Sequence, residues 1–121
     1  MLRLLIRFCF LLLVSHSVDA AAYPPFQALV DEVEPNGTLV PPPGIYSGPV
    51  TLDFPITIDG KGEVTIDAGG EGSVIYVDTD GTVIKNMHLT NSGSSHNDID
   101  SGIQVRGNFN VIKDNVIDNC L

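Results

Sequence analysis

Apolar residues in this chain occur mainly in short runs rich in β-branched residues, separated by Gly, Asn and Asp. The runs are two to four residues long, and no helical period connects one run with the next. Such runs are too short for the strands of a β-sandwich joined by hairpins. The earlier runs alternate apolar residues with Thr, which is typical of half-buried strands. The runs are residues 50–52, 56–58, 64–66, 74–77, 83–84, 103–105 and 111–112.

Part of the chain repeats at a fixed spacing. Residues 83–91 (VIKNMHLTN) align with residues 111–119 (VIKDNVIDN), and Ile75 falls on Ile103 at the same offset. The repeat therefore spans several short strands, and an extra loop at residues 92–101 precedes the second copy. Self-similarity at a period of this size is typical of repeat architectures.

Repeated short strands predict an all-β fold in which parallel strands wind into a solenoid, a parallel β-helix. In such a fold each turn buries its inward side chains only against the turns before and after it. The spacing of the repeat would place Asn91 over Asn119, where stacked amides can form a structural ladder that satisfies backbone groups. The alternative is that both residues lie in turns, because Asn tolerates left-handed backbone angles. The sequence leaves both alternatives open.

One segment predicts a helix that covers the first coil. In residues 26–34 (FQALVDEVE), apolar residues recur at helical spacing, acidic residues lie opposite, and Pro35-Asn36-Gly37 ends the pattern. A solenoid needs such a cap because its end exposes strand edges and core. No comparable segment follows the second repeat. We therefore expect residues 21–121 to be the N-terminal part of one β-helix domain, truncated at its C-terminus.

The first residues predict export. Arg3 and Arg7 flank an apolar run, residues 4–14, that is too short to span a membrane. Residues 1–20 are therefore expected to be a Sec-type signal peptide, with no membrane span in the mature chain. After cleavage 4 basic and 14 acidic residues remain, a net charge near −10, which disfavours nucleic acid as a partner. Cys120 is then the only thiol in the sequence, so no disulfide is expected within it.

Several stretches resemble exported β-helix proteins. PPGIYSGP at residues 42–49 and PITIDGKG at residues 55–62 are similar to the opening of a family with many sugar-binding members. NSGSSHNDIDSGIQV at residues 91–105 resembles the loop that the NosD family inserts between coils, and residues 114–121 are similar to the next coil of that family. The resemblance implies a right-handed parallel β-helix in the periplasm. It also implies an accessory protein that works with an ABC-type transporter in assembling the copper-sulfur centre of nitrous oxide reductase.

A role with copper, as cofactor or as cargo, limits the number of candidate ligands, because copper prefers imidazole and soft sulfur to carboxylate. Met87 is expected in the core as a gap-filler, and His88 is expected to project outward. His96 lies with Asp98 and Asp100 in the inserted loop, and such loops usually hold function or partner contacts. These three residues and His88 are the candidate metal ligands. The alternative is that the loop side chains form hydrogen bonds that only fix the loop.

Two other functions fit the same architecture. The main alternative is a secreted carbohydrate-active enzyme, but lyases of this fold need calcium-binding acidic clusters and a basic residue, and glycosidases need two facing carboxylates. The mature segment has one arginine, Arg106, and its aspartates stand mostly in turn contexts. A solenoid that only binds a polysaccharide or a protein is the other alternative. The sequence assigns no catalytic residue and favours a maturation or binding factor over an enzyme.

Overall fold

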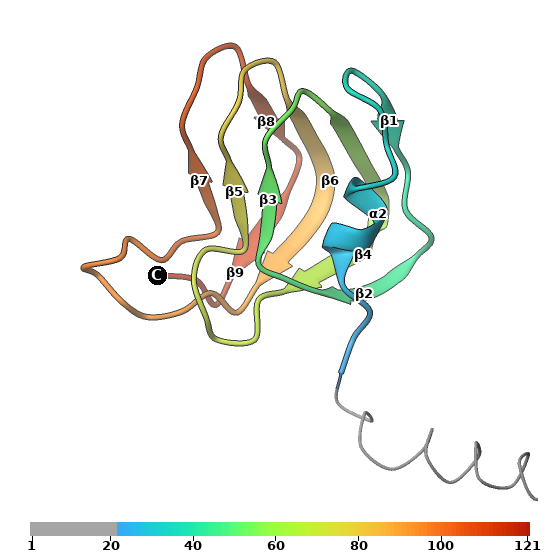
Figure 1. Ribbon diagram of the computed structural model, residues 1–121. Coiled ribbons are helices and arrows are strands. Elements are labelled where there is room, and N and C mark those ends of the chain that lie inside the picture. Colours follow the sequence, from blue (N-terminus) through green and yellow to red (C-terminus); the bar gives the residue numbers. More distant parts are fainter. Residues whose placement is uncertain (1–21) are drawn as a thin grey trace, which may run out of the picture.

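The computed structural model describes residues 22–121, so the expected signal peptide at residues 1–20 lies outside the described residues. The regular secondary structure of these residues is almost entirely β-strand, with one short helix (Figure 1). Within this part of the chain no helix is long and apolar enough to cross a membrane. The elements are α2 (Phe26–Val30), β1 (Thr38–Leu39), β2 (Gly44–Ser47), β3 (Val50–Leu52), β4 (Thr57–Asp67), β5 (Ile75–Val77), β6 (Val83–Thr90), β7 (Ile103–Val105), β8 (Val111–Lys113) and β9 (Val116–Asp118).

The strands form two sheets in which every pair is parallel. The larger sheet has the order β1-β4-β6-β8, with β2 also paired to β4 and β9 also paired to β6. The smaller sheet has the order β3-β5-β7, and these three strands lie side by side in Figure 1. From β3 to β8 consecutive strands alternate between the two sheets, so each turn of the chain adds one strand to each sheet. The all-β class and the parallel pairing are as the sequence predicts.

The strand register agrees with the spacing in the sequence. Where β5 pairs with β7 and where β6 pairs with β8 and β9, each residue lies beside its counterpart in the aligned repeat. Leu89, for example, lies beside Ile117. Between β4 and β6 the offset shortens along the strands, because β4 bulges between Asp59 and Val64. The pairings that involve β3 and β4 thus lack the constant spacing of the later ones.

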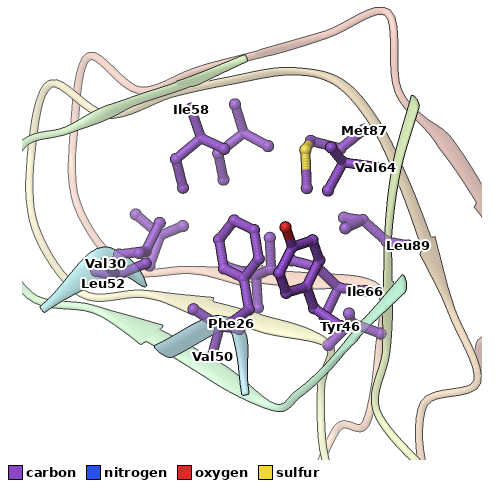
Figure 2. Packing of buried hydrophobic residues seen from close by; sticks show 14 of the residues in the cluster. Phe26, Val30, Tyr46, Val50, Leu52, Ile58, Val64, Ile66, Met87 and Leu89 are labelled. Atoms are coloured by element: carbon purple, nitrogen blue, oxygen red, sulfur yellow. The ribbon is translucent and has the colours of Figure 1, made fainter. Parts of the chain in front are cut away.

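Inward-facing side chains from both sheets stack into one continuous core. In β3, β5 and β6 buried residues alternate with more exposed ones, as expected of strands with one face inward. Removing these apolar rows from water is the main favourable contribution to folding. Figure 2 shows many of these side chains gathered inside the ring of strands. The largest of the fully buried side chains are those of Phe26, Val30, Val50, Leu52, Ile56, Ile58, Val64, Ile66, Ile75, Ile84, Met87 and Leu89.

Helix α2 packs onto the end of the core next to β3. Phe26 and Val30 are both fully buried. The Phe26 ring meets the Tyr46 ring edge to face, with centroids 5.5 Å apart and an interplanar angle of 86° (Figure 2). The Gln27 side-chain oxygen accepts the N–H of Thr51 at 2.8 Å, which ties the helix to the first strand of the smaller sheet. The helix thus covers apolar surface at this end, as a capping segment should.

The helix expected over residues 26–34 is shorter in the structure, where it ends at Val30. The N–H of Val33 donates to the carbonyl of Val30 at 3.0 Å, a bond that closes a turn instead of extending the helix. Pro35 disfavours helical backbone at Glu34, and so short a segment is not held helical by propensity alone. Val33 still packs against the core from the turn. The apolar residues of this segment therefore cover the end of the core as expected, although the helix is shorter than expected.

Two asparagine side chains bind backbone groups of the preceding turn of chain. Asn115 Oδ1 accepts the N–H of Met87 at 2.9 Å, and its Nδ2 donates to the carbonyl of Ile84 at 3.0 Å. Asn110 makes the same kind of paired bond to the segment before β6. Backbone groups that the strand ladder leaves unpaired are thereby satisfied.

Asn91 and Asn119 do not take part in an inward ladder. Both are exposed and have left-handed backbone angles, with φ of 64° and 51°. The side chain of Asn91 donates to Asp67 Oδ1 at 2.9 Å. This geometry corresponds to the turn alternative, because Asn is one of the few residues that adopt it at low cost. The amides that satisfy backbone groups are instead those of Asn110 and Asn115.

The last turn of strands leaves apolar side chains exposed. Ile112 is 41% exposed and Ile117 is 45% exposed, whereas Ile84 and Leu89, on which they stack, are fully buried. Phe109, in the preceding loop, is 89% exposed. Within residues 22–121 nothing covers this face. An uncovered apolar strand edge is a template for further strand pairing.

Asn115→Ala is expected to remove both amide bonds and leave the Met87 N–H and the Ile84 carbonyl without their partner. We expect the free energy of unfolding to fall by about 1 kcal/mol or more, and hydrogen exchange of the Met87 amide to accelerate. Urea unfolding and NMR hydrogen exchange measure these effects. Asn97→Ala, in the exposed loop, is the control and should change neither. Unchanged protection of the Met87 amide in N115A would contradict this role.

Candidate functional site

The loop at residues 92–101 lies outside the core, between β6 and β7. Figure 1 shows it in orange, reaching away from the stacked strands. None of its residues belongs to the apolar core. This placement agrees with the prediction that the insert contributes little to packing and lies at one flank of the molecule.

A network of hydrogen bonds within the loop gives it a defined shape. The buried carboxylate of Asp100 accepts the N–H of Ser95 at 2.9 Å. The Ser95 hydroxyl donates to Asp98 Oδ2 at 2.9 Å and accepts the N–H of Asp98 at 3.2 Å. Asp100 also packs so closely on Gly93 that no side chain fits there. Asp98 and Asp100 therefore come together through Ser95, and both act on the conformation of the loop.

Ser73 anchors the loop to the body of the protein. Its buried hydroxyl accepts the N–H of Ser101 at 3.1 Å, lies 3.2 Å from the Ser101 hydroxyl and donates to the carbonyl of Ile99 at 3.3 Å. Sequence reasoning missed the roles of Ser73 and Ser95. Ser73 and Ser101 stand at the same offset as Ile75 and Ile103, and this is the signal that could have identified the first of them.

His96 is the exposed histidine of this loop. Its carbonyl accepts the N–H of Ile99 at 3.2 Å, which closes a turn at the outer end of the loop. Its imidazole makes no hydrogen bond to any other residue of the described range 22–121. The loop thus presents an imidazole whose ring nitrogens are open to a ligand or a partner.

His88 projects outward from β6, as expected, but its ring is held by two neighbours. Its Nδ1 lies 3.1 Å from the Thr65 hydroxyl, and its Nε2 lies 3.0 Å from Asp118 Oδ1. Thr65 lies beside His88 on β4, whereas Asp118 reaches it diagonally from β9, where it lies beside Thr90. Both ring nitrogens are engaged by these two neighbours. His88 is therefore poorly placed to bind a metal.

The candidate metal ligands do not converge on one point. Among residues 22–121 no group of three or more His, Cys, Asp or Glu side chains is arranged to hold a metal ion. Asp98 and Asp100 are bonded to Ser95, and His88 is bonded on both nitrogens. The residues present therefore do not fit a resident copper centre. A transient contact of copper with His96 stays a prediction.

The carboxyl group of Asp118 is stabilised in its charged form. The Thr90 hydroxyl, and after it the His88 ring, lower the pKa of Asp118 below its ordinary value of 3.8, while partial burial acts in the opposite direction. A carboxylate that accepts hydrogen bonds favours ionisation in this way. Asp118 therefore carries its negative charge throughout the neutral and mildly acidic range.

The two sulfur-containing side chains of the described residues, Met87 and Cys120, have different environments. Met87 is 2% exposed and belongs to the core, as expected of a gap-filling side chain. Cys120 is a free cysteine, partly buried, whose thiol donates to the carbonyl of Asp118 at 3.2 Å. Neither lies in the loop with His96, so sulfur and imidazole do not form a joint site there.

Thr90→Val is expected to raise the pKa of Asp118 toward 3.8, because it removes the largest cause of the lowering. A lowered folded-state pKa stabilises the fold above the ordinary value, and this contribution is lost as the pH falls through the folded-state pKa. The pH-dependent part of stability should therefore shrink in T90V. Carboxyl ¹³C NMR titration and urea unfolding as a function of pH measure both effects. Thr65→Val, which removes only the other bond of His88, is the control, and an equal shift in both variants would contradict the assignment.

Comparisons with known proteins add no assignment to this geometry. No family model, no curated protein and no solved structure matches the chain. The case for a function therefore depends on the loop, on the outward side chains of the sheets and on the resemblance in the sequence.

Proposed function

We propose that the chain forms coils of a right-handed parallel β-helix and is a periplasmic accessory protein of the NosD type. In this role it acts with an ABC-type transporter in assembling the copper-sulfur centre of nitrous oxide reductase. Support for the coils comes from the parallel register, in which strands one repeat apart lie side by side in two sheets. Support for the family comes from the sequence of residues 91–105 and of the repeat that follows.

The single observation that carries the functional part is the defined loop outside the core. Residues 92–101 are fixed by the Asp100–Ser95–Asp98 bonds and anchored by Ser73, yet they add nothing to the apolar packing. A fixed shape at such a place is useful for contact with a partner, since binding residues often lie on loops held by a rigid scaffold. A loop that is already ordered also loses less entropy when it docks.

His96 supplies the chemistry of this loop. A neutral imidazole is a good ligand for copper, and a side chain without an internal partner does not have to break a hydrogen bond before it binds. One imidazole without a second ligand holds a metal weakly. Weak and exchangeable binding suits a protein that passes copper to another site, and copper is then cargo and not a resident cofactor.

The charge of the mature chain is consistent with this role. With 14 acidic and 4 basic residues after residue 20, the surface attracts cations and basic partner surfaces. Such a field raises the local concentration of copper ions and steers the encounter with a positively charged face of a partner.

Co-expression of the full chain with nitrous oxide reductase and its transporter tests the proposal, in a host that lacks its own maturation factor. The copper content and absorption spectrum of the purified reductase should depend on the presence of the chain. His96→Ala is expected to reduce the yield of copper-loaded reductase several-fold, because it removes the unbonded imidazole and leaves the loop bonds intact.

Asn97→Ala is the matched control, since Asn97 is the neighbouring exposed residue of the same loop. It should give the yield of the unmodified chain. A full yield in the His96→Ala variant would contradict the role of the loop. A reductase that is loaded equally well without the chain would contradict the maturation function itself.

A further inference from the structure

A groove of about 400 Å³ lies at the corner where strands of the larger sheet end. Ser47 and Asp67 are the last residues of β2 and β4, and Asn91 directly follows β6. In Figure 1 the start of the described chain passes beside β2, where Pro25 pairs with Ser47. Tyr23, from this starting segment, lines the groove together with Ser47, Asp67 and Asn91. The groove therefore combines side chains from four segments that lie apart in the sequence.

The groove results from the stacking of successive turns of the chain. The register places Ser47 beside Asp67, and Asp67 beside Thr90, so Asn91 begins the same corner one turn later. The N–H of Gly48 donates to the carbonyl of Asp67 at 2.9 Å, which joins two of these corners. The backbone thus holds the polar side chains near one another at the spacing of neighbouring strands.

Asp67 has one carboxylate oxygen that is held and one that is open. Its Oδ1 accepts the N–H of Gly69 at 2.8 Å and the side-chain N–H of Asn91 at 2.9 Å. Its Oδ2 accepts no hydrogen bond from another residue of the range 22–121. Asp67 also takes part in neither of the two ion pairs of that range. The carboxylate is thus oriented through one oxygen and available to a cation at the other.

Neutral acceptors and an aromatic ring accompany this carboxylate in the groove. Because the Asn91 amide nitrogen donates to Asp67, the amide oxygen remains as an acceptor, and the Ser47 hydroxyl adds another. Tyr23 is 40% exposed and contributes its ring. Among the described residues that line the groove none is basic. A groove with acceptors, one negative charge and an aromatic ring favours a cation as its ligand.

We propose that this groove binds the ammonium group of a lysine side chain on a partner protein. The three N–H bonds of the ammonium match the acceptors of Asp67, Asn91 and Ser47, and the apolar stem of lysine packs on the Tyr23 ring. The net charge near −10 that remains after residue 20 draws a basic partner surface toward the chain. The inference does not depend on the maturation role, since the groove and His96 share no residue.

The single open oxygen of Asp67 favours lysine over arginine. A guanidinium binds a carboxylate best through two parallel N–H···O bonds, which require both oxygens. Asp67 Oδ1 already accepts two hydrogen bonds. An ammonium is a compact point charge, so one charged oxygen and neighbouring neutral acceptors are enough. A calcium ion fits less well, because its sites need six to eight oxygen ligands and the groove offers one carboxylate.

NMR titration of the full ¹⁵N-labelled chain tests the proposal. The probes are the blocked tripeptide acetyl-Gly-Lys-Gly-amide, its arginine analogue and its analogue with Nε-acetylated lysine. We expect the lysine peptide to give saturable shifts of the amide signals of Gly48, Gly69 and Asn91. The arginine peptide should bind more weakly, and the acetylated peptide, which lacks the charge, should not saturate. Absence of these shifts, or equal binding of either comparison peptide, would overturn the proposal.

Asp67→Asn removes the charge, while its amide oxygen can keep the place of Oδ1 as acceptor for Gly69 and Asn91. We expect the affinity for the lysine peptide to fall about fivefold, as when a partly exposed ion pair is lost. Asp53→Asn is the matched control, because it removes the same charge from an exposed position outside the groove. It should leave the affinity unchanged. Equal losses in D67N and D53N would show that only net charge attracts the peptide, and would overturn the proposal.

Tyr23→Ala tests the aromatic wall and guards against a folding defect in D67N, because Tyr23 is exposed and lies outside the apolar core. Loss of the ring should weaken binding of the lysine peptide roughly two- to fivefold, the size of an exposed cation–π contact. Tyr23→Phe keeps the ring and should bind like the unmodified chain. Unchanged affinity in both D67N and Y23A would place the peptide elsewhere and would also overturn the proposal.

Discussion

The structure depends on one constraint, the parallel register that places similar apolar residues beside each other in successive passages of the chain. Ile84 and Leu89 are fully buried because Ile112 and Ile117 lie next to them in the following passage. A single passage could not bury these side chains, since such short strands have no partner within their own turn. Asn115 supports the same register from outside the ladder by binding two backbone groups of the preceding turn. The strand register therefore determines which side chains form the core.

Stacking also decides what lies on the outer surface. Because strand residues alternate between the faces of a sheet, each inward row is accompanied by an outward row at the same spacing. On the outer face His88 bonds to Thr65 beside it on β4 and diagonally to Asp118 on β9, and another row brings Tyr76 between Thr51 and Gln104. The chain thus presents ordered sets of unlike side chains without a dedicated pocket-forming domain. The loop at residues 92–101 adds a third surface, whose shape comes from its own hydrogen bonds.

The position of the candidate site could be predicted from the sequence. The roles of its residues could be predicted only in part. That His96 lies in a loop outside the core follows from the break in the repeat, and the structure agrees. The roles of Asp98 and Asp100 were not predictable, because a carboxylate that binds a metal and one that binds a backbone N–H look the same in a sequence. His88 shows the same difficulty, since its two partners, Thr65 and Asp118, lie far from it along the chain on either side. The turn conformation of Asn91 was one of two open alternatives for a similar reason.

The amino-acid sequence by itself determined where the strands lie, their spacing in the second half of the chain and the insert that interrupts them, but not the length of β4, which joins two separately predicted runs, or of β6. These features are local or periodic, so the order of apolar and polar residues is enough to specify them. Only the tertiary structure decided the end of the helix at Val30, the bulge in β4 and the contacts of each polar side chain. A hydrogen bond needs a donor–acceptor distance that is correct to within a few tenths of an ångström between residues far apart in the chain, and periodicity carries no information at that scale.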